Sequence, residues 1–139
     1  MATVELSFTP LPAHVRTARL VATAVARRSG VDESLLDVVR LAVGEACTRA
    51  VEGHQLHCPT EPIWLALTDT PDRFEVEVRD NCAPDSAVPA AKDGKADGTG
   101  VPAGLGIAVI TGLADDVKIS ETSAGTSIRM SWPSAGAVR

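Results

Sequence analysis

Glu45 and Arg49 are the first residues of this chain whose types and spacing suggest chemistry. They stand four positions apart in a stretch with helical periodicity, so both side chains project from one face of the expected helix. A carboxylate there can take a proton from a hydroxyl, and a guanidinium can bind phosphate oxygens. The same spacing also favours an ordinary surface ion pair. The small neighbours Gly44, Ala46 and Ala50 leave room for a ligand beside the helix, which favours a binding site.

Asp80 and Asn81 follow a strand of alternating apolar and polar residues, at a position where a carboxylate can point into a cleft. Such a carboxylate can accept a hydrogen bond from the exocyclic amine of adenine. An aspartate that initiates a turn by bonding its own backbone explains the same residues equally well.

The segment Gly104-Leu105-Gly106 precedes a short apolar helix. Glycines there allow close backbone approach, and the amides at a helix start favour an anion such as phosphate. A plain helix-entry loop is the alternative. Residues 83–103, just before, are rich in proline and glycine and offer little to bury, which is typical of a mobile lid or a disordered insert.

Segments of strand and helical periodicity must position these residues. Ser29 and Gly30 are expected to end the first helix, and Asp32 to cap a second, longest helix that reaches Gly53. The expected strands are 4–8, 63–68, 74–79, 117–120 and 126–132, and the other expected helices are 13–28 and 106–113. These elements predict a single domain over residues 1–132, followed by a frayed tail over 133–139.

The formal net charge of −5 disfavours direct binding to DNA or RNA, because such proteins neutralise phosphates with basic surfaces. No apolar run approaches membrane-spanning length, and the amino terminus lacks the pattern of a secretory signal. We therefore expect no membrane contact and a cytoplasmic location.

The cysteines Cys47, Cys58 and Cys82 are odd in number and lack metal-ligand spacing. This pattern predicts free thiols in a reducing compartment. A zinc site of Cys58 with His54 and His57 is the alternative to a polar turn, and the polar turn is favoured. No metal ligand is therefore expected.

The order of these segments resembles the GHKL ATPase superfamily. The shared features are a long helix with Glu-Ala-Cys-Thr, a strand ending in Asp-Asn, a glycine-rich lid, Gly-Leu-Gly before a helix, and a hairpin with Gly125-Thr126. The bacterial anti-sigma factors with serine kinase activity are the most similar group within it, and the resemblance covers about Val4 to Trp132. It implies a Bergerat-type, two-layer α/β (α+β) fold, with a mixed, mostly antiparallel sheet that carries helices on one face.

The resemblance further implies that the domain binds ATP. Glu45 would lie near the terminal phosphate as a candidate general base for a serine hydroxyl. Asp80 would bind the adenine amine, and Thr126 would support that end of the nucleotide. Gly104 and Gly106 would bind the phosphates. The implied nucleotide-binding set also includes Arg49, Asn81 and Leu105.

Two residues depart from the family pattern. Arg49 stands where the pattern has an asparagine that holds magnesium, and Cys82 replaces the glycine of an Asp-x-Gly motif. Arginine carries only donors, so a metal site centred there is not expected. Three outcomes are open for this position. Arg49 contacts phosphates directly, or it folds onto Glu45 and fills the cleft, or phosphates and waters alone hold magnesium with weakened kinase activity.

The function implied by the resemblance is that of an anti-sigma factor, which sequesters an RNA polymerase sigma factor and is released by an anti-anti-sigma protein. We rank partner binding first, nucleotide binding second and kinase turnover third. Four arginines of the first helix form the candidate sigma-binding face, with a solvated face as the alternative; they are Arg16, Arg19, Arg27 and Arg28. The rival functions are a degenerate, nucleotide-free interaction module of the same fold and a detached histidine kinase catalytic domain. Whether the protein forms a homodimer is open.

Overall fold

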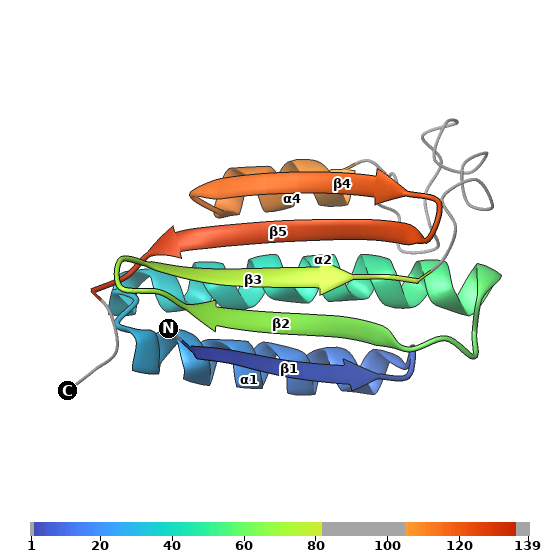
Figure 1. The fold of residues 1–139 in the computed structure, drawn as a ribbon, viewed down its shortest axis with the longest axis horizontal. Helices are drawn as coiled ribbons and strands as arrows, with labels where there is room; N and C mark the ends of the chain where they lie inside the picture. Colours follow the sequence, from blue (N-terminus) through green and yellow to red (C-terminus); the bar gives the residue numbers. More distant parts are fainter. Residues whose placement is uncertain (1, 82–104, 136–139) are drawn as a thin grey trace.

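A computed structural model describes residues 2–81 and 105–135 of the chain (Figure 1). Its helices and strands follow one another in the order that the sequence periodicity predicts. They are β1 (Ala2–Phe8), α1 (Pro12–Ser29), the 3-10 turn η1 (Glu33–Leu35), α2 (Leu36–His57), β2 (Ile63–Asp69), β3 (Arg73–Arg79), α4 (Leu105–Leu113), β4 (Asp116–Thr122) and β5 (Gly125–Pro133).

The five strands form one sheet in the order β1-β2-β3-β5-β4. The helices α1, α2 and α4 all lie on one face of this sheet, with α1 and α4 on opposite sides of α2 (Figure 1). This two-layer α+β arrangement confirms the predicted fold class. The pairings between the described strands are antiparallel throughout, whereas the resemblance implied a mixed sheet.

The alternation along β3 shows how the sequence builds this layer. Phe74, Val76 and Val78 are buried under the helices, while Glu75 and Glu77 lie on the opposite face. The predicted hairpin of β2 with β3 is confirmed, and so is the closing hairpin of β4 with β5. The sheet therefore has one apolar face and one polar face.

Helix α1 packs against α2 and buries a stripe of small residues. Ala18, Ala22 and Ala26 are fully buried. The helix ends where the sequence predicts, because Gly30 adopts a left-handed conformation (φ 90°) and its N–H bonds the carbonyls of Ala26 and Arg27. The second helix is the longest, as predicted, and it continues beyond Gly53 to His57.

The prediction that Asp32 caps α2 is wrong. A 3-10 turn separates Asp32 from α2, and the Asp32 side chain makes no capping bond to helix amides. Its Oδ2 instead accepts a hydrogen bond from the Ser34 hydroxyl at 2.7 Å. A short hydroxyl side chain two residues away competes with backbone amides for the carboxylate.

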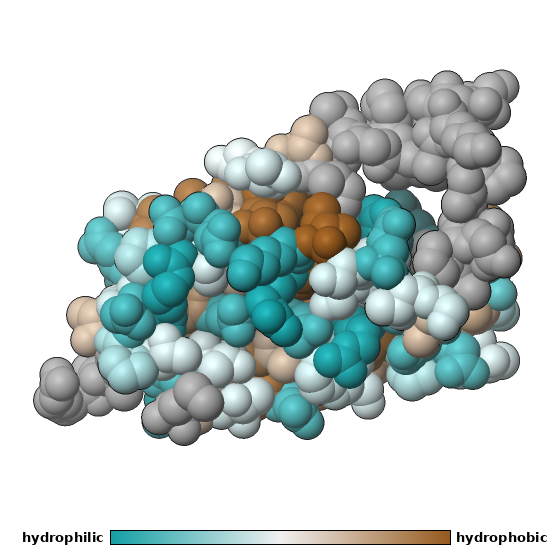
Figure 2. Space-filling model, turned by 45° about the horizontal axis from the view of Figure 1, so that its top comes forward, coloured by the Kyte–Doolittle hydropathy of each residue, from teal (hydrophilic) through white to brown (hydrophobic). Residues whose placement is uncertain are grey.

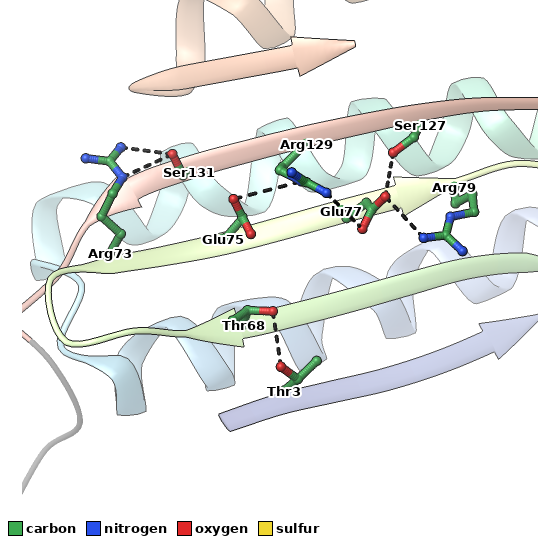
Figure 3. A network of polar contacts seen from close by, with 9 residues as sticks. All are labelled: Thr3, Thr68, Arg73, Glu75, Glu77, Arg79, Ser127, Arg129 and Ser131. Atoms are coloured by element: carbon green, nitrogen blue, oxygen red, sulfur yellow. Dashed lines mark hydrogen bonds and ion pairs between the residues drawn. The ribbon is translucent and has the colours of Figure 1, made fainter. Parts of the chain in front are cut away.

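The open face of the sheet carries a network of polar contacts centred on Glu77 (Figure 3). Its carboxylate accepts hydrogen bonds from Ser127 at 2.6 Å and Arg79 at 3.4 Å, and it lies 3.8 Å from Arg129. Burial alone would raise the pKa of the Glu77 carboxyl. The hydrogen bond from Ser127 and the two guanidinium groups outweigh this effect and hold that pKa below its ordinary value.

The surface in Figure 2 is mostly hydrophilic, with an apolar patch in the upper middle of the view. The edge of the molecule formed by α4 and β4 comes forward in this orientation. Among the side chains that the structure describes on these two elements, the exposed large apolar ones are Val109 of α4 and Ile119 of β4. No helix among the described residues is both long and apolar enough to cross a membrane.

Two cysteines fall within the described residues. Cys47 is buried in α2 as a free thiol, and burial raises its pKa to about 12. Cys58, directly after α2, is disulfide-bonded. The prediction of free thiols is therefore wrong for Cys58, because pairing depends on tertiary distances that spacing in the sequence does not show. Cys82 lies outside the described residues.

The chain is anchored just after β5. The backbone amide of Ser134 donates to the Asp72 carbonyl at 3.0 Å, and that of Ala135 donates to the Gly30 carbonyl at 3.1 Å. These bonds attach the start of the predicted tail to two turns at one end of the molecule. Residues 136–139 and the predicted lid at 83–103 lie outside the described residues.

Candidate functional site

Asp80 lies just beyond β3 and is fixed against the start of β5. Its backbone N–H donates to the Thr126 carbonyl at 2.9 Å, and its Oδ1 accepts the Thr126 N–H at 3.0 Å. Residues two apart share a face of an extended chain, so Asp80 lies on the helix-covered face with Val76 and Val78. The structure thus brings together two residues that the sequence analysis assigned to the adenine end.

Gly125 makes this close approach possible. A Cβ added to residue 125 would lie 2.2 Å from the Asp80 carbonyl oxygen and 2.8 Å from its Oδ1. The φ angle of 153° is also one that residues with side chains rarely adopt. Any other residue type would therefore push the start of β5 away from Asp80.

His54, in the last turn of α2, contacts the residue that follows Asp80. The Asn81 N–H donates to His54 Nε2 at 3.0 Å, and His54 Nδ1 lies 2.9 Å from the Glu61 carbonyl oxygen. The Asn81 side chain donates through Nδ2 to the Pro62 carbonyl at 2.8 Å. These bonds join the end of α2 to the segment that carries Asp80.

The sequence analysis considered His54 only as an alternative zinc ligand. Both of its ring nitrogens are engaged, and Cys58 is in a disulfide, so these two residues do not form a zinc site with His57. Within residues 2–81 and 105–135, no group of three His, Cys, Asp or Glu side chains is placed to hold a metal ion. The sequence analysis did not use the spacing of His54 from Cys47 and Val51. This helical spacing places the histidine among the buried residues on one side of α2.

Glu45 and Arg49 lie on α2 before His54, and both are half-buried. At 1.5 Å per residue, Arg49 is about 8 Å and Glu45 about 14 Å from His54 along the helix axis. Gly44 faces α1, and at about 100° per residue Glu45 and Arg49 are turned roughly 100° and 140° away from it. Glu45 therefore projects roughly perpendicular to the direction of α1, and Arg49 projects on the side of α2 that is turned away from α1.

The i to i+4 ion pair that the sequence analysis gave as the alternative is not formed. Among the ion pairs between described residues, none joins Glu45 to Arg49 within 4.0 Å. Of the three outcomes open for Arg49, the one in which it folds onto Glu45 is thus not the conformation of this structure. The two side chains are therefore not paired with each other in the described part of the chain.

The inference that small residues leave room for a ligand is wrong. Ala46 and Ala50 are 1% and 5% exposed and belong to the hydrophobic core. Gly44 is covered by α1, because the Cδ of Arg19 lies 2.6 Å from where a Cβ of residue 44 would be. Small side chains here allow neighbouring elements to approach closely, and protein atoms fill the space.

A hollow of about 240 Å³ opens at the end of the sheet where β3, β4 and β5 meet. Asp80, Asn81 and Thr126 line it together with polar residues of the open face, whereas Glu45 and Arg49 do not. Gly104 lies outside the described residues. Of Leu105 and Gly106, the structure describes only that they begin α4. A phosphate site at these glycines therefore stays a prediction.

Comparison with known proteins agrees with the observed fold. The chain is similar in fold to the crystal structure of the RsbU and RsbW domains of Rv1364c from Mycobacterium tuberculosis, with a TM-score of 0.68 and 16% sequence identity. The match covers 100% of this chain and 34% of that one, so the chain spans about a third of its length. No curated protein matches. The family described as "Histidine kinase-like ATPase domain" matches residues 8–132. Because this match spans most of the sequence, the chain belongs to the histidine kinase-like ATPase domain family.

Proposed function

We propose that this domain binds an adenine nucleotide between α2 and the Asp80–Thr126 pair, and that it acts as an anti-sigma factor released by an anti-anti-sigma protein. Family membership supports nucleotide binding. Similarity in fold to a structure that contains an RsbW domain supports the regulatory role. The observation that carries the proposal is the two-bond pairing of Asp80 with Thr126 at the end of β3.

The adenine end would lie at Asp80. The bond from the Thr126 N–H to Oδ1 fixes the orientation of the carboxylate before a ligand arrives. A carboxylate can accept about four hydrogen bonds, so it can also accept the exocyclic amine of adenine. A site built around a fixed acceptor discriminates strongly against a base that presents a carbonyl oxygen there. We therefore expect ATP to bind more tightly than GTP.

The triphosphate would extend along α2 from the His54 end toward Glu45. The axial separation of about 14 Å between these residues suits an extended nucleotide. Arg49 lies between them, and its guanidinium has no ion-pair or hydrogen-bond partner among the described residues. It would contact phosphate oxygens directly, as a bidentate cation.

Magnesium does not fit the residues at this position. Arginine cannot ligate a cation, and the described part of the chain offers no cluster of metal ligands. We therefore expect nucleotide binding to persist without magnesium. Because metal ions neutralise charge that develops during phosphoryl transfer, catalysis should lose more than binding from this replacement.

The catalytic step of the proposal is phosphoryl transfer from ATP to a serine of the anti-anti-sigma protein. Glu45 would take the proton from the serine hydroxyl of the anti-anti-sigma protein. The test is to incubate labelled ATP and a cognate anti-anti-sigma protein with the wild type and with Arg49→Asn. Phosphoserine in the Arg49→Asn sample alone would remove the enzymatic claim for the natural protein and leave nucleotide binding intact.

The proposed sigma-binding surface is the outer face of α1. Arg16, Arg19 and Arg27 lie within about 80° of one another around this helix, at roughly 100° per residue. Arg28 is about 120° from Arg16, so it leaves the face to which the sequence analysis assigned it. Arg27 forms an exposed ion pair with Glu33 at 3.7 Å, which makes the other two arginines the stronger candidates.

Arg19 is the best placed of these side chains for a protein partner. Its aliphatic part packs over Gly44, and its guanidinium has no partner among the described residues. Leu20 beside it is 62% exposed, and Leu41 on α2 is 55% exposed. An arginine held by packing next to exposed leucines suits an acidic, amphipathic segment of a partner.

A charge reversal tests this surface with a control on the same helix. Arg19→Glu should weaken the affinity for a cognate sigma factor by about tenfold or more, as expected for an interface hot spot. Arg28→Glu, on another face, should change it by less than about twofold. Equal effects of the two variants on this affinity would show that the arginine face of α1 is not the specific contact with the sigma factor.

The rival function is a nucleotide-free interaction module of the same fold. Titration with a fluorescent ATP analogue separates the two, with and without magnesium. Binding by the wild type supports the nucleotide site. No binding by the wild type combined with binding by Arg49→Asn supports the module.

A further inference from the structure

His54 is a fully buried histidine whose two ring nitrogens are both bonded to backbone groups outside its own helix. Nε2 lies 3.0 Å from the Asn81 nitrogen, and Nδ1 lies 2.9 Å from the Glu61 carbonyl oxygen. An amide N–H only donates, so Nε2 must be the unprotonated acceptor. A carbonyl oxygen only accepts, so Nδ1 must carry the hydrogen. The partners therefore assign a neutral imidazole with its hydrogen on Nδ1.

These bonds join three segments that are distant in the sequence. The histidine belongs to the end of α2, Glu61 to the connection between α2 and β2, and Asn81 to the exit from β3. The Asn81 side chain adds a second bond to the connection between α2 and β2 by donating to the Pro62 carbonyl at 2.8 Å. As a result, the exit from β3 is attached to the helix layer as well as to its neighbouring strand.

The residue held by this arrangement is Asp80. Its own N–H is bonded to the Thr126 carbonyl on β5, and the next N–H along the chain is bonded to His54 on α2. The peptide units on the two sides of the Asp80 Cα are thus each held by one hydrogen bond, and the unit between Asp80 and Asn81 is held by the bond to His54. Removal of the α2 bond would leave a backbone donor unsatisfied next to the carboxylate and free that peptide to rotate.

We propose that His54 is a positioning residue for the adenine end of the nucleotide site, and that it acts by accepting the Asn81 N–H through Nε2. This inference rests on the proposed nucleotide function. His54 does not touch the nucleotide and acts on it through Asp80. The histidine sets the distance and angle between α2, which carries Arg49, and the carboxylate that recognises the base. Its loss should therefore weaken the recognition of adenine and spare the contact with phosphate.

Two amide variants of similar polarity test this role. The side-chain oxygen of His54→Gln can reach the position of Nε2 and accept the Asn81 N–H, whereas that of His54→Asn reaches only the position of Nδ1. We expect His54→Gln to keep the wild-type affinity for ATP within about threefold. His54→Asn should lose about tenfold or more, as expected when a buried donor is left unpaired.

Inorganic tripolyphosphate is the second probe, because it offers phosphates without a base. His54→Asn should bind it with the wild-type affinity, since Arg49 is unchanged, and a merely structural defect would weaken both probes together. Circular dichroism and the protection of the Asn81 amide from hydrogen exchange are measured on the same samples. This protection should fall in His54→Asn and be retained in His54→Gln.

The outcomes separate this inference from the function on which it rests. A wild type that does not bind ATP overturns both. A wild type that binds ATP, with a His54→Asn variant that binds it equally well, overturns the role of His54 alone. A parallel loss of ATP and tripolyphosphate affinity, or equal losses in the two variants, also overturns that role.

Discussion

Replacement of Gly125 by alanine should destabilise the domain because β5 and Asp80 are in backbone contact at this point. The new methyl would lie 2.2 Å from the Asp80 carbonyl oxygen and 3.0 Å from its carbonyl carbon. Backbone atoms cannot move aside as a flexible side chain can, so the start of β5 must shift. The φ angle of 153° adds strain for any residue with a side chain.

The expected cost follows from these two effects. Strain at such a backbone position costs of order 1–3 kcal/mol. Each of the two hydrogen bonds between Asp80 and Thr126 that the shift would break contributes about 1 kcal/mol. We therefore expect a loss of roughly 3–5 kcal/mol, which corresponds to a fall in Tm of about 10–20 °C for a chain of this size.

Gly53→Ala is the matched control, because the same added methyl would meet open space on α2. Alanine is the better helix former, so this variant should be neutral or stabilised by up to about 1 kcal/mol. Thermal unfolding followed by circular dichroism measures both variants. A Tm for Gly125→Ala within about 2 °C of the wild type would refute the claim that β5 and Asp80 are held in this contact.

Three further outcomes follow from the titratable and sulfur-containing groups. Since the pKa of Glu77 is lowered on folding, its stabilising contribution is present at neutral pH and lost as the pH falls through the lowered pKa of the folded state; Glu77→Gln should lower stability at pH 7 by about 1 kcal/mol and flatten the acid limb of a urea-unfolding series. Cys47 has a pKa raised to about 12, so iodoacetamide at pH 8 should label it only after denaturant is added, as peptide mass spectrometry would show. Cys58→Ser should lower stability by about 2–4 kcal/mol, and a reductant should bring the wild type to the same Tm; a wild-type Tm unaffected by reductant would contradict a stabilising disulfide at Cys58.

The layers of this fold could be predicted because their signals are local. The alternation of Phe74, Val76 and Val78 against charged neighbours specifies a strand with one buried face. The alanine stripe of α1 and its Gly30 stop specify a helix of the observed length. The prediction that Asp32 caps α2 was wrong because helix amides and a nearby hydroxyl compete to donate to its carboxylate. The hydroxyl is the group that bonds it.

The site depends on pairings that a single sequence does not contain. The family resemblance could assign Asp80 and Thr126 to the same end of the nucleotide. Their contact, however, depends on the pairing of two strands that are 46 residues apart in the sequence. Gly44 and Ala46 indicate only that something comes close to α2, and that neighbour is protein. The role of His54 requires knowing where Asn81 lies, which no spacing along the helix reveals.

Calorimetric titration of ATP in the presence of EDTA tests the central claim most directly, because it asks whether this domain binds an adenine nucleotide without a metal. The wild type should bind one ATP per chain. Asp80→Asn should weaken that binding by about tenfold or more, since the variant presents an amide to the adenine amine and loses the charged acceptor of the Thr126 N–H. Asp116→Asn, at an exposed carboxylate on β4, should leave the affinity unchanged. The absence of ATP binding by the wild type, or equal affinities in Asp80→Asn and the wild type, would contradict the account.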